Sequence, residues 1–373
     1  MAFSYLNKNW RRGPVINLPL TKDQISRYAP AVFFCGGFVF DVLTLGRIDN
    51  ILNILSHGLY LLLIMGTLIV QFLEVKPSDE PKWLVGLFFA YQNDIVHFLL
   101  GALLNAFVIF YFKSGSLINT FLMLVMLSVL LVINEIKFFK QKGPTLKVVL
   151  FTISLASFFI YLLPVLIGRI SSLIFMGSQF CTVIIILLLG VLLWLLGVEI
   201  LQIRAKLLVP SASVIIIFTF LYAVRVIPPV PLSLKQIGIY HNIEKTTDGF
   251  ILFKQTPPWK FWFQGDQDFV AKEGDVIYLF SRVFAPGGFK DKLFYNFQIK
   301  DQHGRWQNTD KIPMTIVGGR DEGFRGYAYK KNYQDGIWRA LVETTEGREV
   351  GRINFRVSSS TDPSPGVYYQ EVY

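Results

Sequence analysis

The chain is poor in the residues that form disulfides or bind metal ions, with only two cysteines and four histidines in 373 residues. Cys35 and Cys181 both lie inside apolar runs, so residues 235–373 have no cysteine and must depend on their own hydrophobic core. His241 and His303 each lack a second histidine or a cysteine at ligand spacing. We therefore expect no metal site and no cofactor.

Catalytic signatures are missing as well. The sequence has no Gly-x-Ser-x-Gly, no His-Glu-x-x-His and no glycine-rich phosphate loop. The neighbouring carboxylates Asp266 and Asp268 fall in a predicted loop, where such groups are usually solvated. These absences favour a protein that is not an enzyme, although no motif decides the question.

Charge is scarce: 17% of the residues are charged and 53% are hydrophobic, with a mean hydropathy of +0.46. This is too apolar for an ordinary soluble protein. The net charge is +10, and residues 1–234 hold most of it, with 17 Lys and Arg against 9 Asp and Glu. Because this excess lies in short segments between apolar runs, it indicates a membrane protein and argues against nucleic-acid binding.

What the chain has in abundance is long apolar runs, most near the ~20 residues that a helix needs to cross a bilayer. Only a helix satisfies its own backbone polar groups in lipid. The sequence therefore predicts a cytoplasmic N-terminal tail over 1–27 and a helical membrane domain over 28–227. We expect about seven spans, at residues 28–46, 51–73, 85–112, 116–136, 148–167, 179–199 and 209–227.

The distribution of basic residues predicts the orientation of these helices. The side with the N-terminal tail and alternate loops carries thirteen Lys and Arg, and the other side carries three. Basic residues are enriched on the cytoplasmic side of membrane proteins. We therefore expect a multi-pass protein of a bacterial inner membrane, with a cytoplasmic N-terminus and a periplasmic C-terminal domain.

A proline-rich segment over 228–234 separates the apolar half from a region with the period-two pattern of β-strands. Proline cannot continue a helix and favours an extended, semi-rigid path, so this segment is predicted to be a hinge. We expect an antiparallel β-sandwich over 235–358 and a flexible tail over 359–373. The predicted strands are 235–243, 249–256, 275–285, 292–300, 312–318, 324–331, 336–345 and 350–358.

The last part of this region carries a recurring pattern. It runs from Asp335-Gly336-Ile337-Trp338-Arg339 through Glu346-Gly347 to Gly351-Arg352-Ile353-Asn354-Phe355, and it resembles family 2914 of the bacterial domains of unknown function. Gly304-Arg305-Trp306 is similar to the same pattern. The resemblance implies a bacterial inner-membrane protein with an extracytoplasmic domain, and it supplies no catalytic residues.

Polar residues at membrane depth are the strongest functional indication, because such residues are costly and usually face protein or water. At helical spacing three of them form one stripe on the third span, and two more close the fourth span. Glu199, at the end of the sixth span, belongs to the same side. A proton relay or transport path is one interpretation, and interhelical hydrogen bonding is the other. The predicted cluster comprises Asp94, His97, Asn105, Asn134 and Glu135.

A second polar set is expected on the outer side of the helices. Ion pairs that join the helices to the β domain are the first interpretation, and binding of an anionic lipid headgroup is the second. The members of this set are Asp41, Arg47, Asp49 and Arg225.

Aromatic residues are the notable feature of the β region. A row of aromatics with polar neighbours can form a platform for sugar rings or a peptide strand, or it can fill a core. For the run around Trp259 and Trp262, contact with the membrane interface is a third possibility. The candidate ligand-binding residues are Trp259, Trp262, Trp306, Tyr327 and Tyr329.

Two functions from different classes fit these observations. The first is an envelope protein that presents a periplasmic module for a glycan or protein ligand and passes its state through the helices. The second is a transporter or lipid-modifying membrane protein that uses the intramembrane cluster. In both cases the lipid bilayer is a partner and nucleic acid is not.

Overall fold

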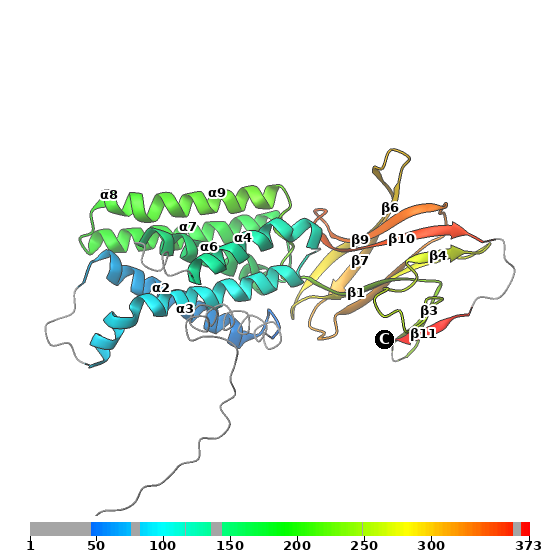
Figure 1. Ribbon diagram of the computed structural model, residues 1–373, viewed down its shortest axis with the longest axis horizontal. Helices are drawn as coiled ribbons and strands as arrows, with labels where there is room; N and C mark the ends of the chain where they lie inside the picture. The colour runs from blue at the N-terminus through cyan, green and yellow to red at the C-terminus, as the bar shows by residue number, and fades with distance from the viewer. Residues whose placement is uncertain (1–45, 76–82, 116, 136–143, 248, 361–366) are drawn as a thin grey trace, which may run out of the picture. The chain divides into compact units, whose positions relative to one another are not determined.

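The computed structural model describes residues 46–373 except 76–82, 116, 136–143, 248 and 361–366. The predicted first span, the N-terminal tail and Asp41 lie outside the described residues. The helical part is labelled in Figure 1. Its elements are α2 (Ile51–Phe72), α3 (Trp83–Lys113), α4 (Leu117–Glu135), α6 (Pro144–Ile167), α7 (Ser172–Leu195), and a continuous helix made of α8 (Ile200–Ile203), the π-helical turn η1 (Arg204–Leu208) and α9 (Val209–Ala223).

Five helices of the described residues are long and apolar enough to cross a membrane, where the sequence predicted seven spans over the whole chain. They are Ile51–Phe72, Tyr91–Lys113, Pro144–Ile167, Ser172–Leu195 and Ile200–Ala223. α4 contains only a shorter apolar stretch, Phe121–Leu130, which is not one of the five candidate spans. The helical half is therefore compatible with a membrane protein.

The last two helices begin earlier than predicted. Ser171 caps α7, its Oγ accepting a hydrogen bond from the N–H of Ile174 at 3.2 Å. Arg204 and Lys206, predicted to lie in a loop, are part of the final helix. Pro210 lies in the first turn of α9, and the preceding π-helical turn joins it to α8 in one unbroken helix although proline has no N–H to donate.

All eight predicted strands are present, with shifted ends, and three further strands accompany them. The strands are β1 (Ser233–Tyr240), β2 (Asn242–Lys245), β3 (Phe250–Lys254), β4 (Asp268–Ala271), β5 (Ile277–Phe284), β6 (Lys290–Lys300), β7 (Trp306–Val317), β8 (Phe324–Lys330), β9 (Gly336–Thr344), β10 (Glu349–Ser359) and β11 (Tyr369–Val372).

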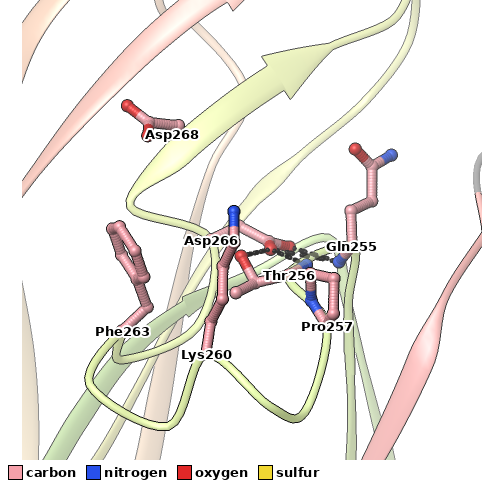
Figure 2. Close-up of a pocket in the computed structure, with 7 residues that line it drawn as sticks. All are labelled: Gln255, Thr256, Pro257, Lys260, Phe263, Asp266 and Asp268. Carbon is pink, nitrogen blue, oxygen red and sulfur yellow. Dashed lines mark hydrogen bonds between the residues drawn. The ribbon is translucent and has the colours of Figure 1, made fainter.

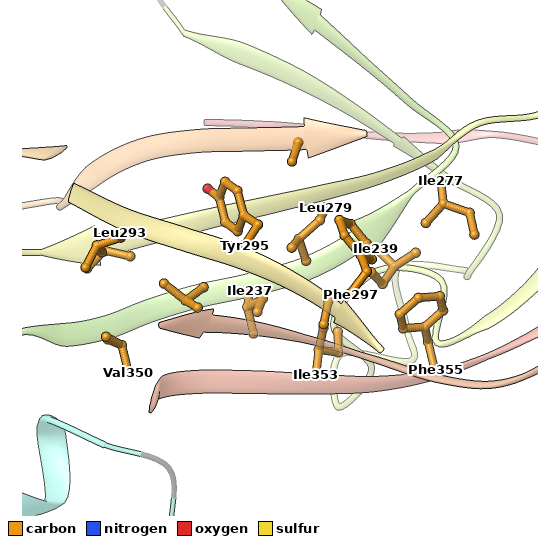
Figure 3. Close-up of a cluster of buried hydrophobic side chains, with 14 of the residues drawn as sticks. Ile237, Ile239, Ile277, Leu279, Leu293, Tyr295, Phe297, Val350, Ile353 and Phe355 are labelled. Carbon is orange, nitrogen blue, oxygen red and sulfur yellow. The ribbon is translucent and has the colours of Figure 1, made fainter. Parts of the chain in front are cut away.

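These strands form three sheets, in the orders β4-β10-β9-β6-β7, β1-β5-β8 and β11-β3-β2. The pairing is antiparallel except between β4 and β10, which run parallel, so the predicted wholly antiparallel arrangement is wrong at this edge. Residues of the first two sheets share one buried core, with Ile237 and Leu279 from one and Tyr295, Phe297 and Phe355 from the other (Figure 3). This core forms without any disulfide.

The predicted hinge is a buried turn. The N–H of Val230 donates to the carbonyl of Pro228 at 2.9 Å, and that of Leu232 donates to Pro229 at 3.0 Å. Ile227 and Leu232 are 1% and 0% exposed. Extended polyproline geometry was the wrong expectation, because the apolar residues between the prolines are buried and Leu232 joins the β core.

The prediction of a flexible tail over 359–373 is also wrong in part. β11 pairs with β3, Lys254 forms an ion pair with Glu371, and the Tyr373 ring stacks on Phe280 at 5.8 Å. The flexible tail was predicted from the Ser- and Pro-rich composition of residues 358–365, which does not continue to the chain end. The final residues are instead rich in Val and Tyr, which favour strands.

Candidate functional site

The loop between β3 and β4 presents a group of exposed aromatic side chains. Trp259, Phe261 and Trp262 are 64%, 84% and 58% exposed. The rings of Trp259 and Trp262 meet edge to face at 6.0 Å, and Lys260 Nζ lies 5.3 Å from the centre of the Trp259 ring. Large apolar rings exposed together mark interaction sites more often than isolated ones do. We call residues 257–263 the aromatic loop.

A buried carboxylate holds the start of this loop. Asp266 is 1% exposed, and its Oδ1 accepts hydrogen bonds from the N–H and the Oγ1 of Thr256, both at 2.7 Å (Figure 2). The N–H of Gln255 donates to the same carboxylate at 2.9 Å. Hydrogen bonds to a carboxylate are stronger than those between neutral groups. Asp266 therefore fixes the start of the loop. The sequence suggested a solvated loop residue, and that expectation was wrong.

A glycine fixes the loop's exit. Gly265 has φ of +73° and forms a bridge with Ile239 of β1. A Cβ at this position would stand 2.0 Å from the carbonyl oxygen of Ile239. Only glycine combines a left-handed backbone with so close an approach. The aromatic loop is thus clamped at both ends to the β region.

A pocket of about 190 Å³ lies beside the aromatic loop. Figure 2 shows Lys260 extending from the loop toward Asp266. The pocket is smaller than the ~300–1,000 Å³ of typical ligand sites, so it suits one part of a larger ligand. Its lining offers a cation, carboxylates, an amide and an aromatic ring, from Gln255, Thr256, Pro257, Lys260, Phe263, Asp266 and Asp268.

His241 lies behind Asp266. Its Nε2 is 3.6 Å from Asp266 Oδ2, its Nδ1 is 3.4 Å from Asp275 Oδ2, and its ring stacks on Phe269 at 4.0 Å. Burial lowers the pKa of His241 below its usual value and outweighs the opposite effect of the two carboxylates. The imidazole is therefore neutral at pH 7.

This pKa shift predicts a dependence of stability on pH. The unfolded state binds a proton at His241 near pH 6.5, whereas the folded state does so only at lower pH. We therefore expect full stability above about pH 6.5 and a loss as the pH falls through the lower, folded pKa. The measurement is the thermal midpoint against pH for the wild type and His241→Gln. The variant should show a shallower acid loss, and equal slopes would contradict this.

The other predicted aromatics lie elsewhere in the β region. Tyr327 and Tyr329 are 43% and 54% exposed on β8, at the edge of the β1-β5-β8 sheet. Trp306 starts β7 in the five-stranded sheet, with the Arg339 guanidinium 4.3 Å from its ring centre. The five candidates therefore do not form one platform. Only Trp259 and Trp262 lie beside the pocket.

The intramembrane candidates are divided as well. His97 and Asn105 are buried at 1% and 6% exposure, but Asp94 of the same helix is exposed. Asn134 and Glu135 end α4, and their side chains lie outside the described residues. Helical spacing alone grouped residues that do not share one environment. Within the described part of the chain, no three His, Cys, Asp or Glu side chains converge to hold a metal ion.

Two other polar groupings among the helices, each around a buried side chain, were missed. Lys147 Nζ donates to Gln71 Oε1 at 2.9 Å and to Asn93 Oδ1 at 2.6 Å, which links α6, α2 and α3. His57 Nδ1 is 3.0 Å from the hydroxyl of Tyr161. In the sequence analysis Lys147 was assigned to a loop between two spans. Its position three residues after Pro144, a residue that favours the first turn of a helix, could have placed it within the helix.

The outer-side set joins helices to the β region at two places. Arg47 pairs with Asp49 at 2.6 Å and also with Asp321, and Asp49 Oδ2 accepts from the N–H of Gly287 at 2.9 Å. Burial acts to raise the pKa of Asp49, but Arg47 and the Gly287 N–H outweigh it, so this pKa is lowered. The second place is the end of α9, where the guanidinium of Arg225 borders Gly347 of the β9–β10 turn.

Comparison with known proteins agrees with the sequence pattern. Residues 290–357, from β6 to β10, match the family model described as "Protein of unknown function (DUF2914)". No curated protein matches the chain. A solved structure of Pseudomonas fluorescens alkylpurine DNA glycosylase AlkC, bound to DNA containing an abasic site analog, aligns at 11% identity over 84% of this chain and 100% of that chain. Its TM-score of 0.23 is too low to carry any argument about this protein. The β-rich C-terminal region of this chain therefore matches, over residues 290–357, the DUF2914 family that its Gly-, Trp- and Arg-containing motifs predicted.

Proposed function

We propose that this chain is a bacterial inner-membrane protein that presents a periplasmic β-sandwich as a binding module for an envelope glycan or a periplasmic protein. The seven predicted spans anchor the module, with the N-terminus in the cytoplasm. The five long apolar helices and the excess of basic residues in alternate loops support this proposal. The shared core of two sheets supports the sandwich.

The observation that carries the proposal is the exposed aromatic loop beside a polar pocket. Aromatic faces stack on the apolar faces of sugar rings, and nearby amide and carboxylate groups bind hydroxyls. Asp266 and Gly265 hold the loop in place before any ligand arrives. Such preorganisation lowers the entropic cost of binding.

The position of the loop favours a ligand in solution over the membrane interface. The helical part contacts the β region at the β5–β6 loop and the start of β6, at the β7–β8 loop and at the β9–β10 turn, as in the bond from Lys290 N–H to the Gly168 carbonyl. The aromatic loop is bridged to Ile239, six residues along β1 from Ser233. At ~3.3 Å per residue this strand carries the loop about 20 Å from the helix exit.

Replacing Trp259 and Trp262 together by alanine tests the proposal. We expect glycan affinity to fall about tenfold or more, because each lost stacking contact contributes roughly 0.5–1.5 kcal/mol. The measurement is calorimetric titration of the full chain in detergent with soluble peptidoglycan fragments and other envelope glycans. Both side chains are exposed, so the thermal midpoint should hardly change.

The matched control is Tyr327→Ala with Tyr329→Ala, which removes two exposed aromatics from β8. This control should bind as the wild type does. If the tyrosine pair abolished binding and the tryptophan pair did not, the site would lie on β8 and the assignment to the loop would be wrong.

The alternative function is a transporter or lipid-modifying protein that uses polar groups within the helices. The contact of the buried Lys147 with Gln71 and Asn93 favours it, because a lysine within a membrane helix bundle is costly and often functional. In that case the tryptophan variant would retain the activity of the protein in cells. The same variant therefore separates the two functions.

A further inference from the structure

A second pocket, of about 270 Å³, lies where the last helix enters the β region. One wall is the chain from Arg225 to Pro229, which follows α9, and the other comes from β6, β9, β10 and the β9–β10 turn. Four arginines line it: Arg225, Arg339, Arg348 and Arg352. We call it the arginine pocket.

The carboxylates of the arginine pocket already have partners. Glu349 is paired with Arg352. Glu343 accepts from Asn296 Nδ2 at 3.2 Å and lies 3.7 Å from Lys311 Nζ. Over the described residues, neither Arg225 nor Arg339 has a carboxylate within ion-pair distance. The pocket therefore carries positive charge that the protein does not neutralise.

Arg339 is held in a fixed orientation by its neighbours. Arg339 donates from Nε to Gln298 Oε1 and stacks on Trp306. Burial and the nearby charge of Arg352 lower the pKa of Arg339, more than the two glutamates raise it. A bound anion would relieve this unfavourable crowding of like charges.

Arg225 has an unusual backbone. It follows α9 with φ of +62°, and its N–H donates to the carbonyl of Tyr222 at 3.0 Å. Glycine is usual at this point of a helix end, and another residue costs about 1–2 kcal/mol. The side chain that incurs this cost is an exposed arginine whose guanidinium borders Gly347. Strained residues concentrate at functional sites.

We propose that the arginine pocket binds a phosphate group, from an anionic lipid headgroup or from a soluble phosphate. Guanidinium groups bind phosphate oxygens in pairs, with a geometry that lysine cannot supply. Arg225 lies two residues beyond Ala223, the end of an apolar helix long enough to span a membrane. This places the pocket at the level of lipid headgroups, so the lipid is the expected source.

The test uses the full chain purified in detergent and two probes, phosphatidylglycerol and inorganic phosphate. Native mass spectrometry counts retained phosphatidylglycerol against phosphatidylcholine, and the thermal midpoint reports stabilisation by phosphate. The first variant is Arg225→Gln with Arg339→Gln. We expect its affinity for the phosphate probe to fall about tenfold, which corresponds to a loss of ~1.4 kcal/mol of binding free energy. The control is Arg356→Gln, an exposed arginine of β10 outside the pocket.

A second variant, Arg225→Gly, guards against loss of the fold. Glycine removes the backbone strain, so the unliganded protein should be at least as stable as the wild type while its phosphate binding falls. The lipid source is supported if the wild type and Arg356→Gln retain phosphatidylglycerol selectively and both pocket variants lose this selectivity. Stabilisation by inorganic phosphate without lipid selectivity, lost in the same variants, supports the soluble source. Equal binding by the wild type and both variants overturns the proposal.

Discussion

Replacing Arg348 by leucine is expected to lower the free energy of unfolding by about 3–5 kcal/mol, because it removes charged hydrogen bonds to buried backbone carbonyls and a desolvated cation–π contact. Arg348 is 7% exposed, and its Nη2 donates to the carbonyl of Tyr222 at 3.0 Å. Its guanidinium carbon lies 3.3 Å above the centre of the Tyr222 ring. The side chain thus joins the end of α9 to the β9–β10 turn.

Loss of Arg348 also removes the positive charge that is paired with Glu346. This carboxylate accepts from the N–H and the hydroxyl of Ser172, at 2.7 and 2.6 Å, and has Arg348 at 3.9 Å. Burial acts to raise the pKa of Glu346, but Ser172 and Arg348 outweigh it and lower this pKa. Without the arginine, a partly buried negative charge remains beside the start of α7.

The measurement is thermal unfolding of the full chain in detergent, where the midpoint should fall by about 10 °C. Arg348→Lys keeps the charge but loses the planar fork, so it should lie between leucine and the wild type. The exposed Arg356→Leu is the control and should change little. A midpoint for Arg348→Leu equal to the control's would show that this junction does not stabilise the fold.

Replacing Gly265 by alanine is the second large effect. The new Cβ would stand 2.0 Å from the Ile239 carbonyl oxygen, a backbone atom that cannot rotate away as the end of a flexible side chain can. Forcing a non-glycine residue into this conformation costs roughly 1–3 kcal/mol, and relieving the overlap costs a similar amount. We expect lower thermal stability and, because the aromatic loop must move, loss of glycan binding.

Gly274→Ala is the matched control. Gly274 also has a positive φ, +85°, but a Cβ there meets no atom within 4 Å. This variant should show only the conformational cost, about 1 kcal/mol, and should bind ligand normally. If both alanines had the same effect, the close approach to Ile239 would not be what holds the loop.

The β region was predictable where strands alternate between buried and exposed residues. Along β10, Ile353, Phe355 and Val357 are buried and the residues between them are exposed. β4 was missed because four residues are too few for a period-two pattern. β11 was missed because its pairing with β3 is a contact across more than a hundred residues.

Helix ends and polar clusters were harder to predict. Arg204 and Lys206 suggested a loop, although long basic side chains can extend from a helix to the membrane surface. Helical spacing grouped Asp94 with His97, but Asp94 is exposed, and the neighbouring Asn93 is the residue that accepts a hydrogen bond from Lys147. The arginine pocket depends on the register of β9 and β10 against the helix exit, which no local pattern encodes.

Hydroxyl-radical footprinting of the full chain in lipid nanodiscs, with and without soluble peptidoglycan fragments, tests whether the aromatic loop binds the glycan. We expect reduced oxidation of Trp259, Phe261 and Trp262 in the presence of ligand, with Tyr327 and Tyr329 unchanged. Unchanged oxidation of the aromatic loop, under conditions where calorimetry shows that a glycan binds, would contradict the assignment of this loop as the binding face.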